Sequence, residues 1–97
     1  RYITVGGAIA SDIHGKNHHR HGCFSEFVED FRILVGSGEV LKCSRVENQE
    51  LYHATCGGMG LTGVILDASF RLKKTASPFI DQTTIKARDL EAVVALF

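Results

Sequence analysis

The stretch FRILVGSGEVLKCSRV, residues 31–46, decides the fold that we predict for this chain. Apolar side chains alternate at Phe31, Ile33 and Val35, which is typical of a strand. The glycines of VGSGEV then predict a hairpin turn, and EVLKCSRV supplies the returning strand. A connection this short cannot make a parallel crossover, so we expect a largely antiparallel sheet. Its partly buried candidates are Val40, Leu41 and Cys43.

On the C-terminal side, a helix around residues 50–55 is predicted to stop at Gly57 and Gly58. GVILDASFRLKK, residues 63–74, alternates along its length and predicts a strand with one buried face. The face with Val64, Leu66, Ala68, Phe70 and Leu72 is the apolar one. Beyond a linker at TASP we expect a further strand, FIDQTTIKA, and a helix that Asp89 opens as N-cap.

On the N-terminal side, RYITVGG predicts a strand and AIASDI a short helix, followed by the loop HGKNHHRHG. Phe24, Phe27, Val28 and Phe31 have helical spacing, so a short helix or turn should lead into the strand that starts the hairpin. The fold class is therefore α+β, with a mainly antiparallel sheet and flanking helices.

Composition limits the function classes. The 97 residues suffice for one small domain, and 11 basic against 11 acidic residues disfavour a partner held by nonspecific electrostatics, such as nucleic acid. Three widely spaced cysteines indicate reduced thiols in a cytoplasmic protein, and no apolar run reaches the roughly 20 residues that span a bilayer. Because the sequence starts at Arg1 within a strand-like run and stops within an amphipathic one, we expect a fragment.

Two local motifs each allow a plain structural explanation. The dense histidines of residues 14–21, with Cys23, could ligate zinc, but Gly15 and Asn17 interrupt a shared helical face, so a partly solvated loop is the better interpretation. The glycines of GGMGLTG, residues 57–63, would let a phosphate or a ring approach the backbone, although a helix stop with a tight turn explains them as well.

Together, ITVGGAIASDIHGKNHH (residues 3–19) and LYHATCGGMGLTGVILDASFRL (residues 51–72) are more specific. They resemble the second subdomain of the PCMH-type FAD-binding domain in oxidoreductases of the vanillyl-alcohol-oxidase type. Within that superfamily the similarity is greatest to the oxidases of decaprenylphosphoryl-β-D-ribose and their bacterial relatives. The resemblance covers residues 1–74, as the C-terminal half of the FAD-binding domain, and leaves residues 75–97 as a linker and the truncated start of a substrate domain.

This resemblance implies where FAD would lie. Its cofactor contacts would come from the first glycine cluster, the segment that follows it, and one strand residue whose backbone faces the adenine end. These residues are Thr4, Val5, Gly6, Gly7, Ser11, Asp12, Ile13, His14 and Ile65. Glycine would be needed where a side chain would collide with the cofactor.

The resemblance also implies the chemistry. His14 and Lys16 would line the substrate side, where they orient a sugar hydroxyl or favour reduced flavin. The reaction would be oxidation of a secondary alcohol of a sugar or polyol-like substrate by hydride transfer to noncovalently bound FAD. The missing halves of the cofactor site predict weak or absent FAD binding by this chain alone, and its exposed apolar surface predicts self-association.

A different class of function stays open. The chain would then be a small non-catalytic module that binds a ligand or protein partner, with a metal in the histidine loop. A yellow colour of the full-length protein would favour the flavoprotein.

Overall fold

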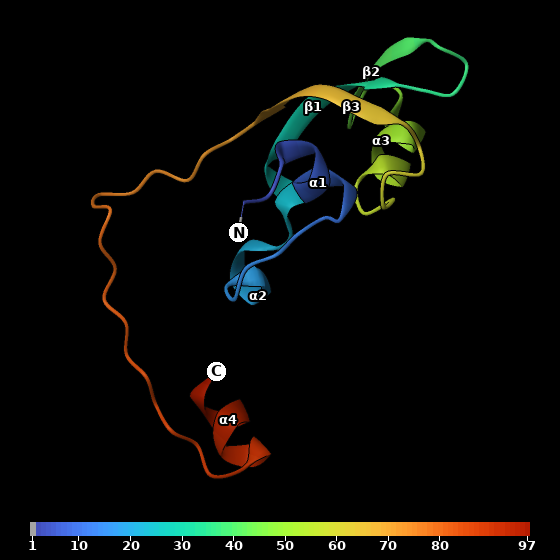
Figure 1. The fold of residues 1–97 in the computed structure, drawn as a ribbon. Coiled ribbons are helices and arrows are strands. Elements are labelled where there is room, and N and C mark those ends of the chain that lie inside the picture. The colour runs from blue at the N-terminus through green and yellow to red at the C-terminus, as the bar shows by residue number, and fades with distance from the viewer. Residues whose placement is uncertain (1) are drawn as a thin grey trace.

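The computed structural model describes residues 2–97, so that Arg1, where the first predicted strand begins, lies outside the described part. The elements in chain order are α1 (Val5–Ala10), α2 (His18–His21), the 3₁₀ helix η1 (Phe24–Phe27), β1 (Val28–Leu34), β2 (Val40–Ser44), α3 (Gln49–Thr55), β3 (Val64–Phe70) and α4 (Leu90–Leu96). In Figure 1 a long extended segment leads from β3 to α4, which lies apart from the sheet.

The three strands form one antiparallel sheet in the order β2-β1-β3, which confirms the predicted α+β class and hairpin. The turn is closed by the Val35 amide, which donates to the Glu39 carbonyl at 3.0 Å, and by the Gly38 amide, which donates to the Val35 carbonyl at 2.9 Å. Gly38 has φ +86°, a conformation that glycine adopts without strain. Gly38 therefore allows the turn that joins the two strands.

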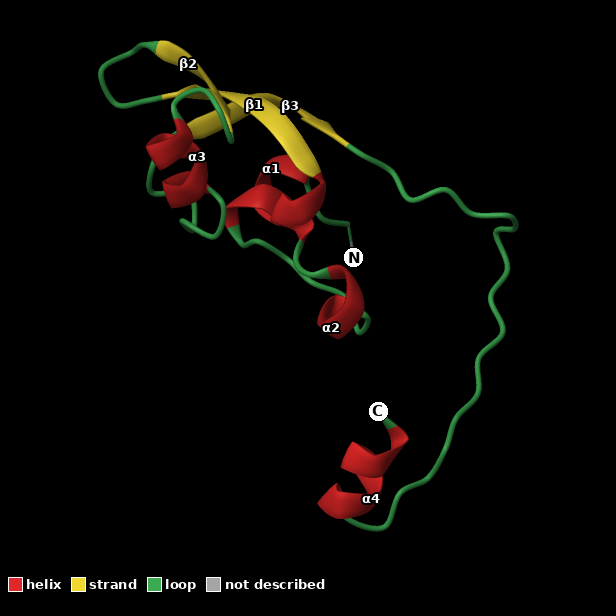
Figure 2. Cartoon of the chain, turned by 180° about the vertical axis from the view of Figure 1, so that it is seen from behind, coloured by secondary structure: helices red, strands yellow, loops and turns green. Residues whose placement is uncertain are grey.

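One face of the sheet carries the core. Phe31 and Ile33 of β1 are fully buried with Ile9 of α1 and Tyr52 of α3, and the Phe31 and Tyr52 rings stack with centroids 5.4 Å apart. Both helices lie on this same face (Figure 2). Each such side chain contributes about 1.5–3 kcal/mol by leaving water, so this cluster fixes α1 and α3 against the central strand.

The predicted buried face of β3 is partly wrong, because bulges interrupt the β1–β3 ladder. Arg32 pairs with Asp67, whereas Ile33 pairs with Ile65, which leaves Leu66 as an extra residue. Beyond this bulge the faces exchange, since side chains alternate with a period of two. Ala68 and Phe70 face the core as predicted, but Leu66 is 48% exposed, and Ile65 packs against the core in its place.

Val64 and Leu72, also predicted on the buried face, are 62% and 84% exposed. Val40, a partly buried candidate of β2, is exposed as well, while Leu41 and Cys43 pack inward. Val40 is the first residue of β2, beside the turn, and pairs with Leu34, the last residue of β1.

Two strand predictions are wrong. Within residues 2–7 the chain forms no strand: α1 begins at Val5 because the Thr4 side chain caps it, with Oγ1 accepting from the Gly7 amide at 3.0 Å. Residues 79–87 form no regular element, because no neighbouring strand lies beside them to complete a ladder. The helix opened by Asp89 is confirmed as α4, with the carboxylate accepting from the Ala92 amide at 2.9 Å.

All three cysteines are free thiols. Burial raises the pKa of the Cys43 thiol, and burial together with the nearby Asp12 carboxylate raises that of Cys56. Among residues 2–97, no helix combines the length and the apolar character that crossing a bilayer requires.

Tyr52→Phe tests the buried hydroxyl, which lies 3.0 Å from the Val28 carbonyl oxygen and 3.2 Å from that of Ser25. We expect a loss of about 1–2 kcal/mol in the free energy of unfolding by urea denaturation, because buried carbonyls lose a donor. Tyr2→Phe, at a fully exposed ring, is the matched control and should change nothing.

The same pair gives a pH test. Burial raises the pKa of Tyr52 above its ordinary value, so the unfolded state ionises first. The contribution of Tyr52 to stability should be complete below about pH 10 and fall as pH rises through the raised pKa of the folded state. Tyr52→Phe should flatten this alkaline loss, and an unchanged alkaline profile would contradict the assignment.

Candidate functional site

The first glycine cluster and β3 meet in a groove of about 260 Å³. Val5 and Gly6 form one wall from the start of α1, and residues 65–68 with Phe70 form the other wall from β3. Thr4 caps the helix that carries Gly6 and Gly7, and Ile65 packs beside Gly6. Five of the predicted cofactor residues therefore lie at or beside this groove. These five are Thr4, Val5, Gly6, Gly7 and Ile65.

Gly6 and Gly7 differ in what the chain itself demands of them. A Cβ on Gly7 would lie 2.9 Å from the Thr4 Oγ1 that caps the helix, so glycine there serves the cap. A Cβ on Gly6 would meet only the Ile65 Cβ, at an ordinary 3.8 Å, and Gly6 has no positive φ. Packing within the described residues therefore does not require glycine at position 6, although glycine weakens a helix.

The second glycine cluster lies against the end of α1. The Gly57 amide donates to the Ile9 carbonyl at 3.0 Å, and the Met59 amide donates to the Ala10 carbonyl at 2.8 Å. A Cβ on Gly58 would fall 2.1 Å from the Ala54 carbonyl oxygen, so this glycine is needed for the helix stop itself. The contacts place the second glycine cluster at the C-terminal end of α1, whereas Gly6 and Gly7 lie in the first turn of that helix.

The histidine loop, residues 13–24, is closed at its base. The Phe24 amide donates to the Ile13 carbonyl at 2.8 Å, and the Asp12 carboxylate accepts from the Ser25 amide at 2.8 Å and from its hydroxyl at 3.1 Å. Asp12 adopts φ +41°, a conformation that aspartate tolerates better than most residues. The loop that carries His14 and Lys16 is thus anchored to the start of η1.

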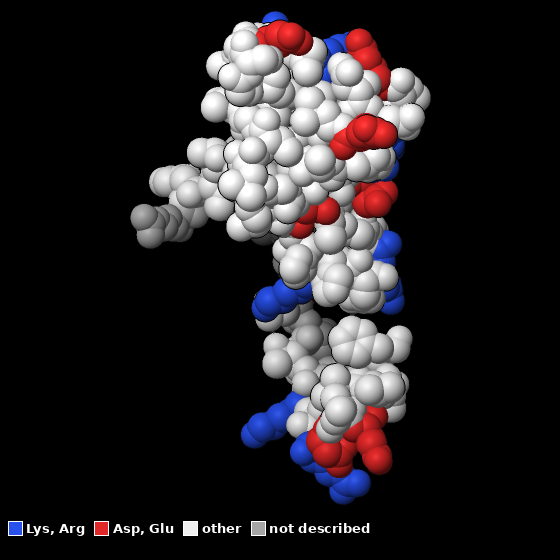
Figure 3. All heavy atoms as spheres, turned by 90° about the vertical axis from the view of Figure 1, so that its right-hand side faces the viewer, with Lys and Arg blue, Asp and Glu red and all other residues white. Residues whose placement is uncertain are grey.

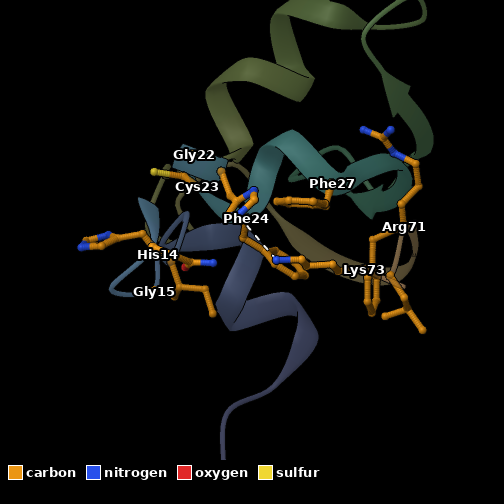
Figure 4. A pocket seen from close by; sticks show the side chains of 13 residues that line it. His14, Gly15, Gly22, Cys23, Phe24, Phe27, Arg71 and Lys73 are labelled. Carbon is orange, nitrogen blue, oxygen red and sulfur yellow. Dashed lines mark hydrogen bonds between the residues drawn. The ribbon is translucent and has the colours of Figure 1, made fainter. Parts of the chain in front are cut away.

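A second pocket, of about 390 Å³, lies between the histidine loop and the end of β3 (Figure 4). Phe24, Phe27 and Phe70 give it an aromatic floor, and His21 and Lys73 are polar residues at its rim. Ile13 and His14 also line it, and Phe70 lines both the pocket and the groove beside α1. Groove and pocket are therefore neighbouring parts of one surface.

The remaining predicted site residues are placed differently. Ser11 is exposed at the C-cap of α1, and the Asp12 carboxylate is turned to Ser25. Lys16 is exposed and does not line the pocket that His14 lines. The structure thus brings Ile13 and His14 together and leaves Lys16 beside them in the loop.

The histidines touch one another as rings. His14 and His18 lie edge to face with centroids 4.8 Å apart, and His18 and His19 lie 6.2 Å apart. Across residues 2–97 no three His, Cys, Asp or Glu side chains converge in a geometry that could hold a metal ion.

Charges are scattered over the surface. Figure 3 shows a largely uncharged face with isolated Asp and Glu side chains on the main body. Arg32 and Asp67 form a bidentate pair across β1 and β3, and this contact lowers the pKa of the Asp67 carboxyl and raises that of the Arg32 guanidinium. Both side chains are exposed, so the pair ties two strands and does not build a site.

The aromatic floor and the His21–Lys73 rim are features of this pocket that the sequence did not identify. The helical spacing of Phe24 and Phe27 and the alternation through Phe70 to Lys73 were the available signals. Neither signal shows that the two segments meet, because they are more than 40 residues apart.

Comparison with known proteins gives relatives but no matching family model. The chain is 44% identical over 80 residues to decaprenylphosphoryl-β-D-ribose oxidase of Mycolicibacterium smegmatis, covering 81% of this chain and 17% of the oxidase. It is 38% identical over 73 residues to cytokinin dehydrogenase 5 of Arabidopsis thaliana, covering 74% of this chain and 13% of that enzyme. A protein of Streptomyces coelicolor encoded in the mprA 5′ region is 40% identical over 93 residues, covering 96% of this chain. The chain spans 25% or less of the length of each of these three relatives.

Asp12→Ala tests the anchor of the histidine loop. We expect amide hydrogen exchange at Phe24 and Ser25 to accelerate and the free energy of unfolding to fall by about 1–3 kcal/mol, because a carboxylate that accepts two hydrogen bonds is removed. Ser25→Ala keeps the hydrogen bond from the backbone amide to Asp12 and loses only the one from the hydroxyl, so its effect should be smaller. Asp81→Ala, in the exposed extended segment, is the control. Equal exchange in Asp12→Ala and Asp81→Ala would show that Asp12 does not hold the loop.

Proposed function

This chain is a homologue of oxidoreductases that include a decaprenylphosphoryl-β-D-ribose oxidase and cytokinin dehydrogenases, and we propose that it forms the C-terminal half of an FAD-binding domain. The homology confirms the resemblance noted in its motifs. In this proposal residues 1–74 belong to that half, and residues 75–97 lead into a substrate domain. The complete protein would be an FAD-dependent oxidoreductase that acts on a CH–OH group.

Gly6 is the observation that carries the proposal. It lies in a helix, at an exposed groove, where a Cβ would have room within this chain and would project toward Ile65. A glycine that the chain's own packing does not need fits a position where a ligand backbone or ring approaches the helix closely. The apolar wall of Val5, Ile65 and Phe70 suits the flat part of such a ligand.

The residues around it would divide the work of holding FAD. Thr4, Val5, Gly6 and Gly7 would lie along the cofactor, Ile65 would offer its backbone at the adenine end, and the Ser11–His14 segment would continue toward the ring. FAD would bind there without a covalent link, and it would accept the hydride. The chain's part is to exclude water with its apolar walls and to keep the cofactor aligned.

His14 and Lys16 would face the substrate, a sugar or polyol-like alcohol. His14 lines the aromatic pocket, and the Asp12–Ser25 anchor holds the base of its loop. An imidazole held in this way can orient a hydroxyl or take its proton, and the Lys16 ammonium on the same loop can stabilise negative charge as it develops.

The partners proposed here follow from the same surface. Large apolar side chains are exposed at Tyr2, Ile3, Val5, Val64 and Leu66, and we propose that other parts of the complete protein cover them. In the isolated chain they would favour self-association and weaken FAD binding. A cytoplasmic location is consistent with three free thiols.

FAD titration tests this function in the protein encoded by the complete reading frame that contains these residues. Gly6→Ala should weaken FAD binding, which is measured by flavin fluorescence. The free energy of unfolding of the apoprotein should stay unchanged or rise by up to about 0.5–1 kcal/mol. Gly36→Ala is the matched control. Gly36 lies in the hairpin turn and does not line the groove, and a Cβ there meets nothing within 4 Å. His14→Ala should lower turnover of a sugar alcohol more than FAD affinity.

The proposal is wrong if the complete protein binds no FAD, or if Gly6→Ala and Gly36→Ala bind it equally well. Loss of FAD binding together with loss of folding in Gly6→Ala would also contradict it, since the chain has room for the added methyl group.

A further inference from the structure

The pocket between the histidine loop and the end of β3 has features that the flavin proposal does not use. Its aromatic floor is preorganised, since the Phe24 and Phe70 rings lie tilted with centroids 5.4 Å apart and Phe27 completes the surface. Aromatic faces and edges of this kind favour a flat aromatic ring over a branched aliphatic group. The volume of about 390 Å³ falls within the range of small-molecule sites.

The rim of this pocket has two nitrogen atoms side by side, with the Lys73 ammonium as the donor. The Lys73 Nζ lies 3.5 Å from the His21 Nε2, although the two residues are 52 positions apart in sequence. Figure 4 shows the Lys73 side chain extending across the pocket, with this contact dashed. Within residues 2–97 no acidic side chain forms an ion pair with Lys73.

The neighbouring arginine is already engaged. Arg71 donates to the Glu26 carbonyl at 2.9 Å and lies 4.0 Å from the Glu29 carboxylate. The positive charge left for a ligand is therefore that of Lys73, whose ammonium keeps N–H donors beyond the one directed to His21 Nε2. An anionic oxygen that accepts from Lys73 Nζ would form a charge-assisted hydrogen bond, which is about twice as strong as a neutral one.

We propose that this pocket binds a small aromatic anion, with its ring on Phe24, Phe27 and Phe70 and its carboxylate or sulfonate against Lys73 Nζ. The pocket shares Ile13, His14 and Phe70 with the proposed function, and it goes beyond that function because Phe24, Phe27 and Lys73 are not among the proposed flavin contacts. A bound anion would tie α2 to the segment that leaves β3, two parts of the chain that the Lys73–His21 contact now joins.

The test uses the ¹⁵N-labelled chain and two probes that differ in charge, 2-naphthoate and 2-naphthamide. Naphthoate should bind saturably and shift the amides of Gly22, Phe24 and Leu72, with naphthamide binding more weakly. Lys73→Gln should weaken naphthoate about fivefold, the equivalent of roughly 1 kcal/mol for one exposed ion pair. Lys74→Gln removes the same charge one position along, outside the pocket lining, and should change binding less than about twofold.

Any one of several results would overturn the site. They are equal affinity for both probes, equal effects of Lys73→Gln and Lys74→Gln, shifts confined to Val5, Gly6 and Ile65, and no saturation. Displacement of naphthoate by FAD, tested in the protein encoded by the complete reading frame, would also overturn it, because the pocket would then belong to the flavin. That last result would support the proposed function, so the two proposals fail separately.

Discussion

The stack of Phe31 on Tyr52 is the contact on which the other parts depend. It holds α3 against the central strand, and it places the Tyr52 hydroxyl beside the carbonyls of Val28 and Ser25. Ser25 in turn gives its amide and hydroxyl to Asp12, which closes the histidine loop. A chain of direct contacts therefore runs from the buried core to the loop that carries His14, although His14 itself is exposed.

Local signals allowed about half of the fold to be predicted. The hairpin, α3 with its glycine stop, and the Asp89 cap of α4 each depend on residues within a few positions of one another. The faces of β3 could not be predicted, because the bulge at Leu66 is set by pairing with β1, more than 30 residues earlier. The strand predicted around Thr4 was wrong for a local reason. The β-branched residues there suggested a strand, but the Thr4 hydroxyl caps a helix.

The candidate site shows the same division. The resemblance in the motifs pointed to Thr4–Gly7, Ser11–His14, Lys16 and Ile65. Of these, Val5, Gly6 and Ile65 line the groove, and Ile13 and His14 line the neighbouring pocket. Spacing alone could not separate Gly6 from Gly7, because the difference lies in what a Cβ would touch in space. The Lys73–His21 contact was equally hidden, since it joins two segments whose meeting depends on the whole sheet.

The bulge in β3 has a consequence for how this chain meets other chains. Within residues 2–97, β3 pairs with β1 on one side only, so its outer side presents backbone amides and carbonyls to the surroundings. A straight strand of this kind is a template for ladder formation with a foreign strand. The extra residue at Leu66 breaks the spacing of that template and twists it locally, so an intruding strand would lose register partway along. The irregularity that spoils the alternation of β3 thereby protects its free edge.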